Sequence, residues 1–309
     1  LALDKQDYGT MDKILTGKQK VFDINIRDIN GRTVLMNVCD EGLNEYAEKI
    51  MHLKGIKMNL QDNTKKTALI CACISNQPSI VLLFLESRER LDIDFNVKDE
   101  DGLTALSHAV NNHFYEIALL LLDQENIDIS PTDKSQLFLM TYEMDKPDHF
   151  NKLFDDDSFD HNAVNTEGES LLHLSYLKND ATTFDRILRS NDDRISNSQN
   201  ELFDVNKADK TEKTVLMHAC INGDFDTVEK MFDTKTIKVN QKGPDGKTAL
   251  MMACLYDCDD IVKLFYQKRK ELSVDFQLQD DSGKTAFEMA KEVDSEKVIK
   301  LSKLFEVIP

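Results

Sequence analysis

The chain has 309 residues, of which 41 % are hydrophobic, and a formal net charge of −18 at pH 7. This surplus of acidic residues argues against a nucleic-acid partner, whose phosphates are bound by clustered Lys and Arg, and against an anionic membrane surface. No apolar stretch reaches the roughly 20 residues that a membrane-spanning helix needs, so direct membrane insertion is not expected.

One short motif recurs along the chain at intervals of 32 to 44 residues. A period of this size is typical of repeat arrays, in which each unit buries its apolar face only against its neighbours. A degenerate copy fits at Gln136-Leu137-Phe138. The clear copies, in chain order, are Thr33-Val34-Leu35, Thr67-Ala68-Leu69, Thr104-Ala105-Leu106, Ser170-Leu171-Leu172, Thr214-Val215-Leu216, Thr248-Ala249-Leu250 and Thr285-Ala286-Phe287.

Each copy predicts the start of a first helix. Its Thr or Ser suits the N-cap, where the hydroxyl accepts a hydrogen bond from a backbone N–H of the first turn. Five positions after the cap the side chain is small in nearly every copy, so neighbouring first helices are expected to pack closely. Two positions before the cap, five copies have a glycine, which allows the positive φ of a tight turn: Gly31, Gly102, Gly168, Gly246 and Gly283.

A second helix follows in each unit, because apolar residues recur 14, 17 and 18 positions after the cap, as in Val81, Phe84 and Leu85. Each unit is therefore predicted to be two antiparallel helices followed by a turn-bearing loop. Eight positions before each cap stands an amide or carboxylate side chain, which is expected to hydrogen-bond the loop backbone between units. These residues are Asn25, Asn59, Asn96, Asp128, Asn162, Asn206, Asn240 and Gln277.

Together these features resemble the ankyrin repeat, which is written T-P-L-H-x-A at a period of about 33 residues. The resemblance runs from Ala2 to about Leu304. It implies an all-α fold, an ankyrin-repeat solenoid of stacked helix-turn-helix units with hairpin-like loops. The chain departs from the family pattern in two ways: no copy has Pro after the Thr, and only the copy at Ser170 keeps the His, as His173.

We predict a single array over residues 1–309, with nine units. Residues 1–15 match only the second half of a unit, so the chain is expected to be part of a larger polypeptide. The last unit is expected to act as a C-terminal cap, because its second helix is polar. The approximate units are 1–27 (partial), 28–61, 62–98, 99–130, 131–164, 165–208, 209–242, 243–279 and 280–309.

Two stretches break the regular pattern, both within residues 131–208. The unit at Gln136 lacks the glycine and has Thr141 and Tyr142 where small residues or thiols are usual. The unit at Ser170 carries about ten extra residues, through 190–200, which are polar and are predicted to form a surface loop. The sequence leaves open whether this irregular middle is a hinge or a binding site.

The chain has six cysteines, and four of them occupy one repeat position, six after the cap: Cys39, Cys73, Cys220 and Cys254. At that position they are expected to be small, buried packing residues rather than metal ligands or disulfide partners. No C-x-x-C pair suggests zinc. Free thiols fit a reducing compartment, so an intracellular protein, cytoplasmic or nuclear, is expected.

No motif in the sequence carries a recognisable chemistry, so the chain is not expected to be an enzyme and no cofactor is expected. G-x-S-x-G, a phosphate-cradling glycine loop and H-E-x-x-H do not occur. The acidic run 155–157 with Asp160, beside His161, invites a metal interpretation. A solvated loop is favoured instead, because consecutive carboxylates point in different directions.

The resemblance implies an interaction scaffold that binds a partner protein or peptide along its concave surface of inner helices and loops. Four, seven and eight positions after the cap, the later units present Leu174, Leu177, Ile221, Met252, Leu255 and Tyr256. The units at Thr33 and Thr104 have polar residues there instead: Asn37, Asp40, Glu41, His108, Asn111 and Asn112. One position before the cap stand Lys213, Lys247 and Lys284, which would suit an acidic peptide. The plainer interpretation is that the apolar side chains pack against the next repeat and that basic residues are common before the cap.

A second functional hypothesis makes this chain the regulatory or substrate-recruiting ankyrin domain of a larger enzyme or channel whose active part lies outside it. A sensor of small ligands is less favoured, since no basic or aromatic pocket converges in the pattern. The sequence does not identify the partner, the pathway or the oligomeric state.

Overall fold

The computed structural model describes residues 23–197 and 202–293, so the predictions for residues 1–15 and for Lys297, Lys300 and Lys303 lie outside the described residues. Within the described ranges the regular structure is helical, with three isolated β-bridges. The first helices of the repeats, here called inner helices, are α2 (Val34–Asp40), α4 (Ala68–Ile74), α6 (Ala105–Asn111), α8 (Pro131–Glu143), α10 (Leu171–Leu177), α12 (Val215–Asn222), α14 (Ala249–Leu255) and α16 (Ala286–Glu292). The second, outer helices are α3 (Asn44–Met51), α5 (Pro78–Ser87), α7 (Tyr115–Leu122), α9 (Pro147–Phe154), α11 (Ala181–Ser196), α13 (Phe225–Phe232) and α15 (Asp259–Lys268), and a short 3-10 turn, η1, covers Pro244–Gly246.

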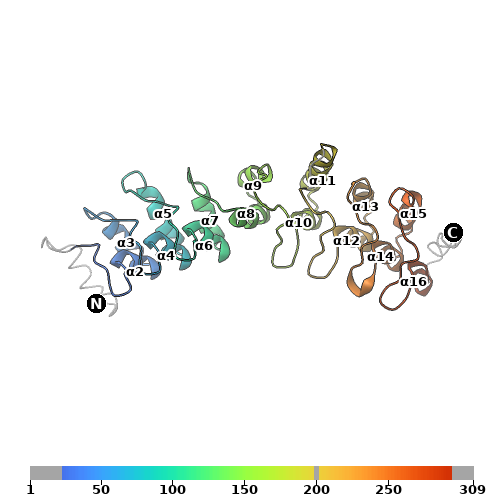
Figure 1. The fold of residues 1–309 in the computed structure, drawn as a ribbon, viewed down its shortest axis with the longest axis horizontal. Coiled ribbons are helices and arrows are strands. Elements are labelled where there is room, and N and C mark those ends of the chain that lie inside the picture. Colours follow the sequence, from blue (N-terminus) through green and yellow to red (C-terminus); the bar gives the residue numbers. More distant parts are fainter. Residues whose placement is uncertain (1–22, 198–201, 294–309) are drawn as a thin grey trace. The chain divides into compact units, whose positions relative to one another are not determined.

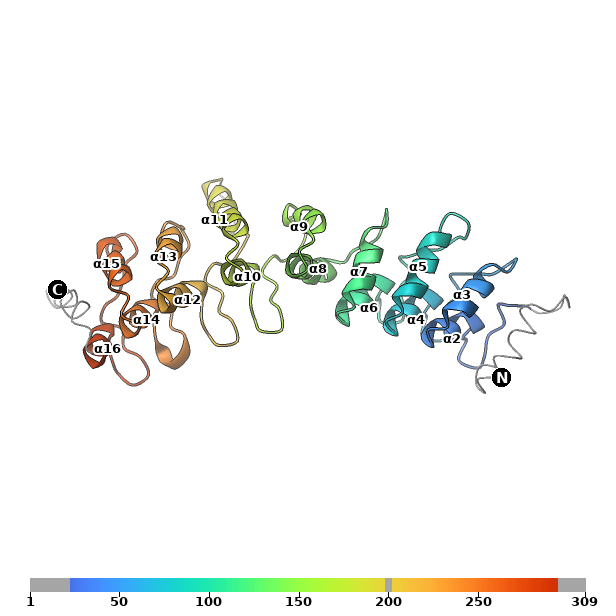
Figure 2. The same ribbon diagram turned by 180° about the vertical axis from the view of Figure 1, so that it is seen from behind.

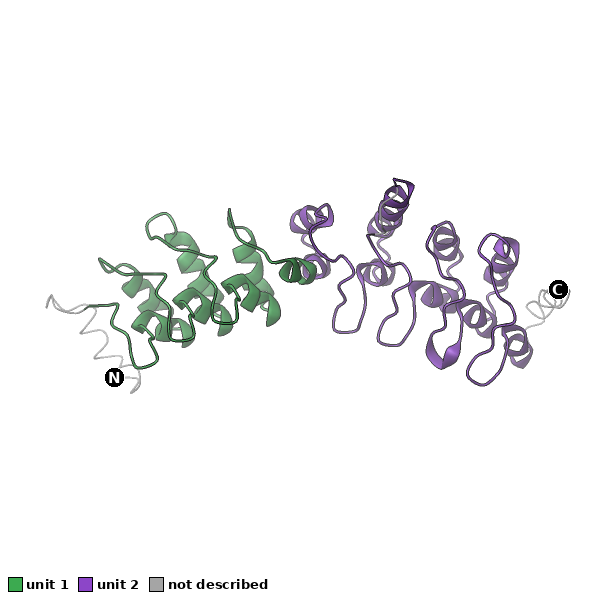
Figure 3. Cartoon of the chain, in the orientation of Figure 1, with its two compact units in different colours: residues 1–137 green, residues 138–309 purple. Residues whose placement is uncertain are grey.

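The chain forms two compact units, residues 1–137 (unit 1) and 138–309 (unit 2) (Figure 3). In each unit, Figures 1 and 2 show the inner helices in one row and the outer helices in a second row. Inner helices of successive repeats contact each other, as α2 with α4 and α12 with α14 do, and each also contacts the outer helix of its own repeat. The predicted all-α fold of stacked helix pairs is therefore confirmed.

The predicted cap residues begin the inner helices. Thr33, Thr67, Thr104, Thr214, Thr248 and Thr285 all have extended backbone, and each hydroxyl accepts a hydrogen bond from the N–H three residues on. Ser170 takes the same place before α10, where His173 Nδ1 lies 3.0 Å from its hydroxyl. Loss of one such cap costs about 1 kcal/mol.

The small residues five positions after each cap allow the inner helices to pack closely. Ala72, Ala109, Ala219, Ala253 and Ala290 are all completely buried. The neighbouring thiols of Cys39, Cys73, Cys220 and Cys254 are completely buried too, and the six cysteines are free. The prediction of packing cysteines is confirmed.

The asparagines that precede the caps connect successive repeats by paired hydrogen bonds. Asn59 Nδ2 donates to the carbonyl of Asp92 (3.0 Å), and its Oδ1 accepts from the N–H of Asp94 (2.9 Å). The same pair of bonds reaches the following loop from Asn25, Asn96, Asn162, Asn206 and Asn240. The prediction that these side chains fix the loops is confirmed for the six asparagines, each of which binds the loop of the next repeat; for Asp128 and Gln277 it stays a prediction.

Helix α8 begins earlier than the sequence pattern indicates. The prediction that Gln136 caps this helix is wrong, because α8 starts at Pro131 and Gln136 lies inside it. Proline suits the first helical position, and the Ser130 hydroxyl accepts from the N–H of Asp133 (3.1 Å). Buried Asp133 in turn accepts a hydrogen bond from the Ser107 hydroxyl of the preceding inner helix (2.7 Å). Extra helix thus replaces the glycine turn of the other repeats.

The extra residues after Ser170 lengthen an outer helix instead of forming a loop. Residues 190–196 belong to α11, which has 16 residues, so the prediction of a surface loop there is wrong. Asn191 explains the difference, because it is buried and makes three hydrogen bonds to backbone. Its Oδ1 accepts from the N–H groups of Leu202 (3.0 Å) and Phe203 (2.9 Å), and its Nδ2 donates to the Phe203 carbonyl (2.6 Å).

Candidate functional site

The residues predicted to contact a partner all lie in unit 2, but they differ in exposure. Leu177 and Tyr256 are 52 % and 56 % exposed, and Ile221 and Leu255 are half-buried. Leu174 and Met252, four positions after the cap, are only 6 % and 5 % exposed. For these two the prediction of a partner contact needs correction, because their side chains pack within the unit.

Two further apolar side chains extend the exposed set. Met144 and Val293 are exposed and stand eight positions after Gln136 and Thr285, the register that Tyr256 occupies after Thr248. Neither residue was predicted from the sequence, because the prediction considered only the units at Ser170, Thr214 and Thr248. We call the set at the C-terminal ends of α8, α10, α12, α14 and α16 the apolar stripe: Met144, Leu177, Ile221, Leu255, Tyr256 and Val293.

Unit 1 has a different surface at the same repeat positions. There the residues seven and eight after the caps are Asp40, Glu41, Ile74, Ser75, Asn111 and Asn112, so five of the six are polar. Since the two units have the same repeat architecture, the fold alone does not require exposed apolar residues at this place. The apolar stripe is therefore specific to unit 2.

Hydrogen bonds between neighbouring repeats hold the ends of these inner helices in place. Lys178 Nζ donates to the carbonyls of Tyr142 and Glu143 (3.2 Å each) and lies 4.7 Å from the centre of the Tyr142 ring. The Tyr142 hydroxyl donates to Asp180 (3.0 Å). Asn222 Nδ2 donates to the Tyr176 hydroxyl (2.9 Å). These contacts connect the C-terminal ends of α8, α10 and α12 to one another.

The three predicted lysines before the caps are half-buried and engaged within the chain. Lys247 pairs with Asp245 (2.8 Å) and Lys284 with Glu292 (2.6 Å), while Lys213 Nζ donates to the Thr211 hydroxyl (3.1 Å). Two of the three charges are therefore balanced by a neighbouring carboxylate. This balance reduces what the lysines offer to an acidic peptide.

The turns that join inner to outer helices in unit 2 are rich in carboxylates. Residues 143–148, 177–181, 221–226 and 255–260 contain nine Asp and Glu and two Lys. The corresponding residues of unit 1, 40–45, 74–79 and 111–116, contain four Asp and Glu and no Lys or Arg. We call the four segments of unit 2 the acidic turns; they contain or directly follow the stripe residues 144, 177, 221, 255 and 256.

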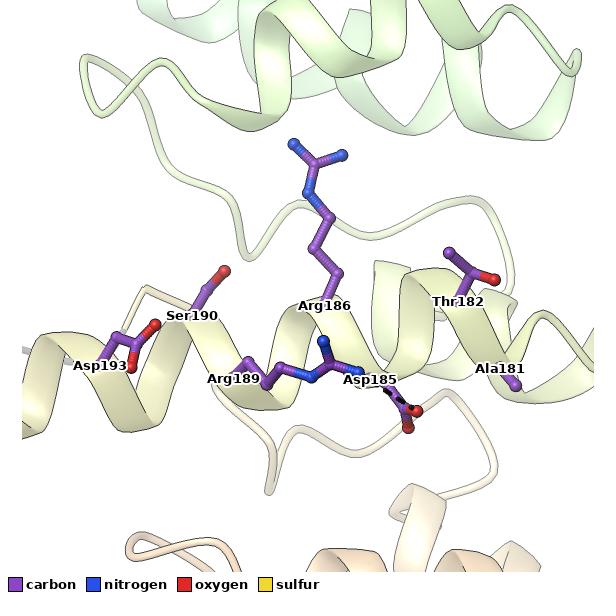
Figure 4. A pocket seen from close by; sticks show the side chains of 7 residues that line it. All are labelled: Ala181, Thr182, Asp185, Arg186, Arg189, Ser190 and Asp193. Carbon is purple, nitrogen blue, oxygen red and sulfur yellow. Dashed lines mark ion pairs between the residues drawn. The ribbon is translucent and has the colours of Figure 1, made fainter.

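Hollows on the described part of unit 2 include two that charged side chains line. The larger, of about 540 Å³, follows the surface of α11 and is lined by Ala181, Thr182, Asp185, Arg186, Arg189, Ser190 and Asp193 (Figure 4). Its charges already pair, because Arg189 reaches Asp185 (3.8 Å) and Lys230 does so as well (2.8 Å). The smaller, of about 240 Å³, lies between the α8–α9 and α10–α11 repeats, where Tyr142, Phe150, Asp145 and Asp180 contribute to its lining.

The acidic loop after α9 does not assemble a metal site with His161. Asp155 pairs with Arg186 and Asp157 with Arg194 (2.8 Å each). His161 is buried instead, so its expected place in a solvated loop is wrong: its ring stacks on Phe159, with centroids 4.1 Å apart. Over residues 23–197 and 202–293, no three His, Cys, Asp or Glu side chains come together as a metal-binding group.

His161 belongs to an aromatic cluster in the core of unit 2. Phe138 is at its centre, with ring centroids 5.3 Å from Phe150, 5.1 Å from His161 and 6.3 Å from Phe203. Phe154 and Phe159 complete the cluster. The cluster is not apparent from the sequence, because its members come from four separate segments of the chain.

Two buried histidines are expected to make unit 2 sensitive to acid. Burial lowers the pKa of His161 and of His173 from the ordinary value of about 6.5. The unfolded chain therefore binds protons below about pH 6.5 that the folded unit does not bind. Above about pH 6.5 these two histidines do not change the free energy of unfolding. Below that pH they lower it, by at most about 1.4 kcal/mol per pH unit for each histidine.

Urea unfolding followed by circular dichroism between about pH 7.5 and pH 5 measures this loss. Replacement His161→Phe keeps a ring in the cluster and is expected to reduce the slope of stability against pH. The exposed His52→Phe is the matched control and is expected to leave that slope unchanged. Equal slopes in the wild type and the His161→Phe protein would contradict the assignment to His161.

Two other histidines fasten loops to inner helices. His108 Nε2 lies 2.7 Å from Asp99, and His218 Nε2 lies 2.7 Å from Asp209. Burial alone raises the pKa of Asp209, but hydrogen bonds from Thr211, His218 and the N–H of Lys213 outweigh burial and lower it to about 2. Both pairs join the loop before an inner helix to the helix itself, a structural role that the sequence analysis did not foresee.

Comparisons with known proteins agree with this architecture. Residues 2–99, 35–133 and 195–280 match the family model described as ankyrin repeats (3 copies). Over 209 residues the chain is 28 % identical to an ankyrin repeat protein of Acanthamoeba polyphaga mimivirus. The matched region is 65 % of this chain and 26 % of that protein. The chain thus spans about a quarter of the length of the curated relative it matches. Among the described helices, none has the length and apolar character to cross a membrane.

Proposed function

Because this chain belongs to the ankyrin-repeat family, whose members generally serve as protein–protein interaction modules, we propose that it holds a partner protein on the apolar stripe of unit 2. The recurrence of exposed apolar residues at the C-terminal ends of inner helices, in four repeats of unit 2, carries the proposal. Single exposed apolar residues are normal on protein surfaces and need no explanation. Here exposed apolar residues occur at the ends of α8, α10, α14 and α16, whereas the corresponding residues of unit 1 are mostly polar.

Tyr256 is the expected anchor of the contact. It is the most exposed residue of the stripe, and Tyr is enriched among the few interface residues that carry most of the binding energy. Its neighbour Leu255 is half-buried and supports it from the last turn of α14. Leu177 is the second exposed contact, two repeats away.

Replacement Tyr256→Asp is expected to weaken partner binding by about tenfold to a hundredfold, because it removes an aromatic contact and adds a charge. Since the side chain is exposed, thermal unfolding should remain within a few degrees of the wild type. Partners captured by the wild-type protein from a lysate, with dissociation constants then measured by calorimetry, provide the test.

Tyr115→Asp in unit 1 is the matched control, since it changes the same side chain at another exposed site. It should leave the affinity unchanged. A captured partner that binds the wild type, Tyr256→Asp and Leu177→Asp proteins equally would contradict the proposed role of the stripe.

The second candidate function is that of a recruiting or regulatory segment in a larger protein. The observation that favours it is the relative's length, since this chain matches only about a quarter of that protein. Deleting residues 202–293 from the full gene product would then abolish recruitment of a substrate without abolishing the activity of the remaining part. The free thiols of the chain support the proposal of an intracellular location.

A further inference from the structure

The acidic turns, which contain five of the stripe residues, also place carboxylates beside the apolar stripe along the chain and so give it a charged border. Nine carboxylates and two lysines give these four segments a net charge of −7. A segment lying on the stripe therefore meets negative charge along this edge. A second copy of this chain, with its net charge of −18, is a poor fit to such a border.

The smaller hollow lies at this border and combines rings with carboxylates. Tyr142 and Phe150 provide aromatic lining, and Asp145 and Asp180 provide the carboxylates. Asp145 follows Met144 of the stripe directly, and Asp180 follows Leu177 by three residues. Burial alone raises the pKa of Asp180, but hydrogen bonds from Thr183 and Tyr142 outweigh burial and lower it, so the carboxylate is ionised at neutral pH.

Two basic residues also line this hollow and limit what it accepts. Arg186 is occupied elsewhere, because its guanidinium donates to Asn151 (2.5 Å) and Asp155 (2.8 Å) and lies over the Phe154 ring. Lys146 is exposed at the rim. A cationic side chain entering the hollow gains from the two carboxylates and loses a little to Lys146.

The spacing of the repeats suits a helical ligand. Packed helices lie about 8–10 Å apart. Residues i and i+7 of an α-helix share a face and are separated by roughly 10.5 Å. A helix lying across the inner helices thus presents one apolar residue to each repeat, and about 20 residues would reach three or four repeats.

We infer that the partner segment held by the apolar stripe is a cationic amphipathic helix. Its apolar face lies on the stripe, its Lys and Arg side chains face the acidic turns, and one of them enters the hollow beside Asp145 and Asp180. This inference rests on the proposed function of the stripe and specifies the chemistry of the partner.

Three synthetic peptides test the inference against the whole chain by fluorescence anisotropy. The first has Leu at heptad spacing with Lys and Arg on its flanks, the second has the same Leu with Glu on its flanks, and the third has the residues of the first in scrambled order. The first is expected to bind at least about tenfold more tightly than either of the others. Its affinity should fall when the salt concentration rises from about 50 to about 300 mM, because salt screens exposed charges.

Substitutions in the chain locate the charged contact. Asp145→Asn removes a charge and keeps a residue that tolerates the positive φ of 55° at this position, and it is expected to weaken the first peptide about threefold to tenfold. Lys146→Gln should strengthen it. Glu229→Gln, on the outer helix α13 of the same unit, is the matched control and should change nothing.

The outcomes separate this inference from the proposed function. If the Glu-flanked peptide binds as tightly as the cationic one and Tyr256→Asp abolishes both, the stripe is a docking surface and the inference of a cationic helix is overturned. An unchanged affinity of the cationic peptide for the Asp145→Asn protein overturns the assignment of the hollow. If Tyr256→Asp leaves the binding of all three peptides unchanged, both proposals fail.

Discussion

Replacing Phe138 with alanine is expected to lower the free energy of unfolding of unit 2 by about 3–5 kcal/mol, which is typical when a buried phenylalanine is truncated in a core. The side chain is completely buried, and its ring lies within 6.3 Å of five other rings by centroid distance. The cavity left behind would lie at the centre of the cluster, where the remaining rings, drawn from several segments, cannot easily close it.

The measurement combines urea unfolding with hydrogen exchange read by mass spectrometry. Exchange should become faster in residues 138–165 and 202–210, whereas residues 34–87 of unit 1 should keep their protection. Phe225→Ala removes the same side chain from a half-buried place on α13 and is expected to cost only about 1 kcal/mol. A loss below about 2 kcal/mol for Phe138→Ala would show that the cluster contributes less than its burial indicates.

The variant Asn191→Leu is expected to destabilise unit 2 by about 2–4 kcal/mol. Leucine has a similar volume but makes no hydrogen bonds, so the N–H groups of Leu202 and Phe203 and the carbonyl of Phe203 lose their partner. Buried backbone groups left without a partner cost about 1–3 kcal/mol each when they cannot reach water.

The loop bearing Leu202 and Phe203 should detach first, since Asn191 ties it to α11. Faster exchange of the amides at residues 202–206 would report this detachment, together with a lower urea midpoint. Asn222→Ala removes one exposed hydrogen bond, to Tyr176, and serves as the control with an expected loss below about 1 kcal/mol. Unchanged exchange at residues 202–206 in Asn191→Leu would contradict the tethering role.

The regular repeats could be predicted from the sequence because each carries its own local signals. Thr67 marks the start of α4, and the small Ala72 and Cys73 mark the face that packs. Helix α8 was misplaced because its repeat lacks those signals. The start was nevertheless legible in Ser130-Pro131-Thr132-Asp133, where a serine cap precedes a proline at the first helical position.

The remaining differences depend on contacts between distant segments. Residues 190–196 are polar and read as a loop, yet α11 continues through them because Asn191 binds backbone that comes eleven and twelve residues later. His161 is followed and preceded by polar residues, and only the fold brings Phe138 and Phe203 to it.

The candidate surface was predicted in part. The register that contains Leu177 and Tyr256 was found from the sequence, and both are exposed. Leu174 and Met252 share a helix face with Leu177 and Tyr256, because residues three or four apart lie on one side of a helix. They stand one turn before the helix end, however, and are only 6 % and 5 % exposed, so including them was wrong. The Asp and Glu residues of the acidic turns could be related to the stripe only after the structure had shown the inner helices of unit 2 in one row.

The hydrogen bonds from the asparagine side chains to the next loop bear on how a repeat protein gains or loses repeats during evolution. Each carboxamide recognises only backbone atoms of the copy that follows, as Asn206 does with Thr236 and Lys238. Duplication or loss of a whole copy therefore leaves such a junction chemically intact. An insertion within a copy does so too, since Asn162 binds Leu202 and Asp204 across the repeat with the extra residues. Among residues 23–197 and 202–293, Asp128 occupies this position without an amide, and a carboxylate has no hydrogen to donate to the next loop.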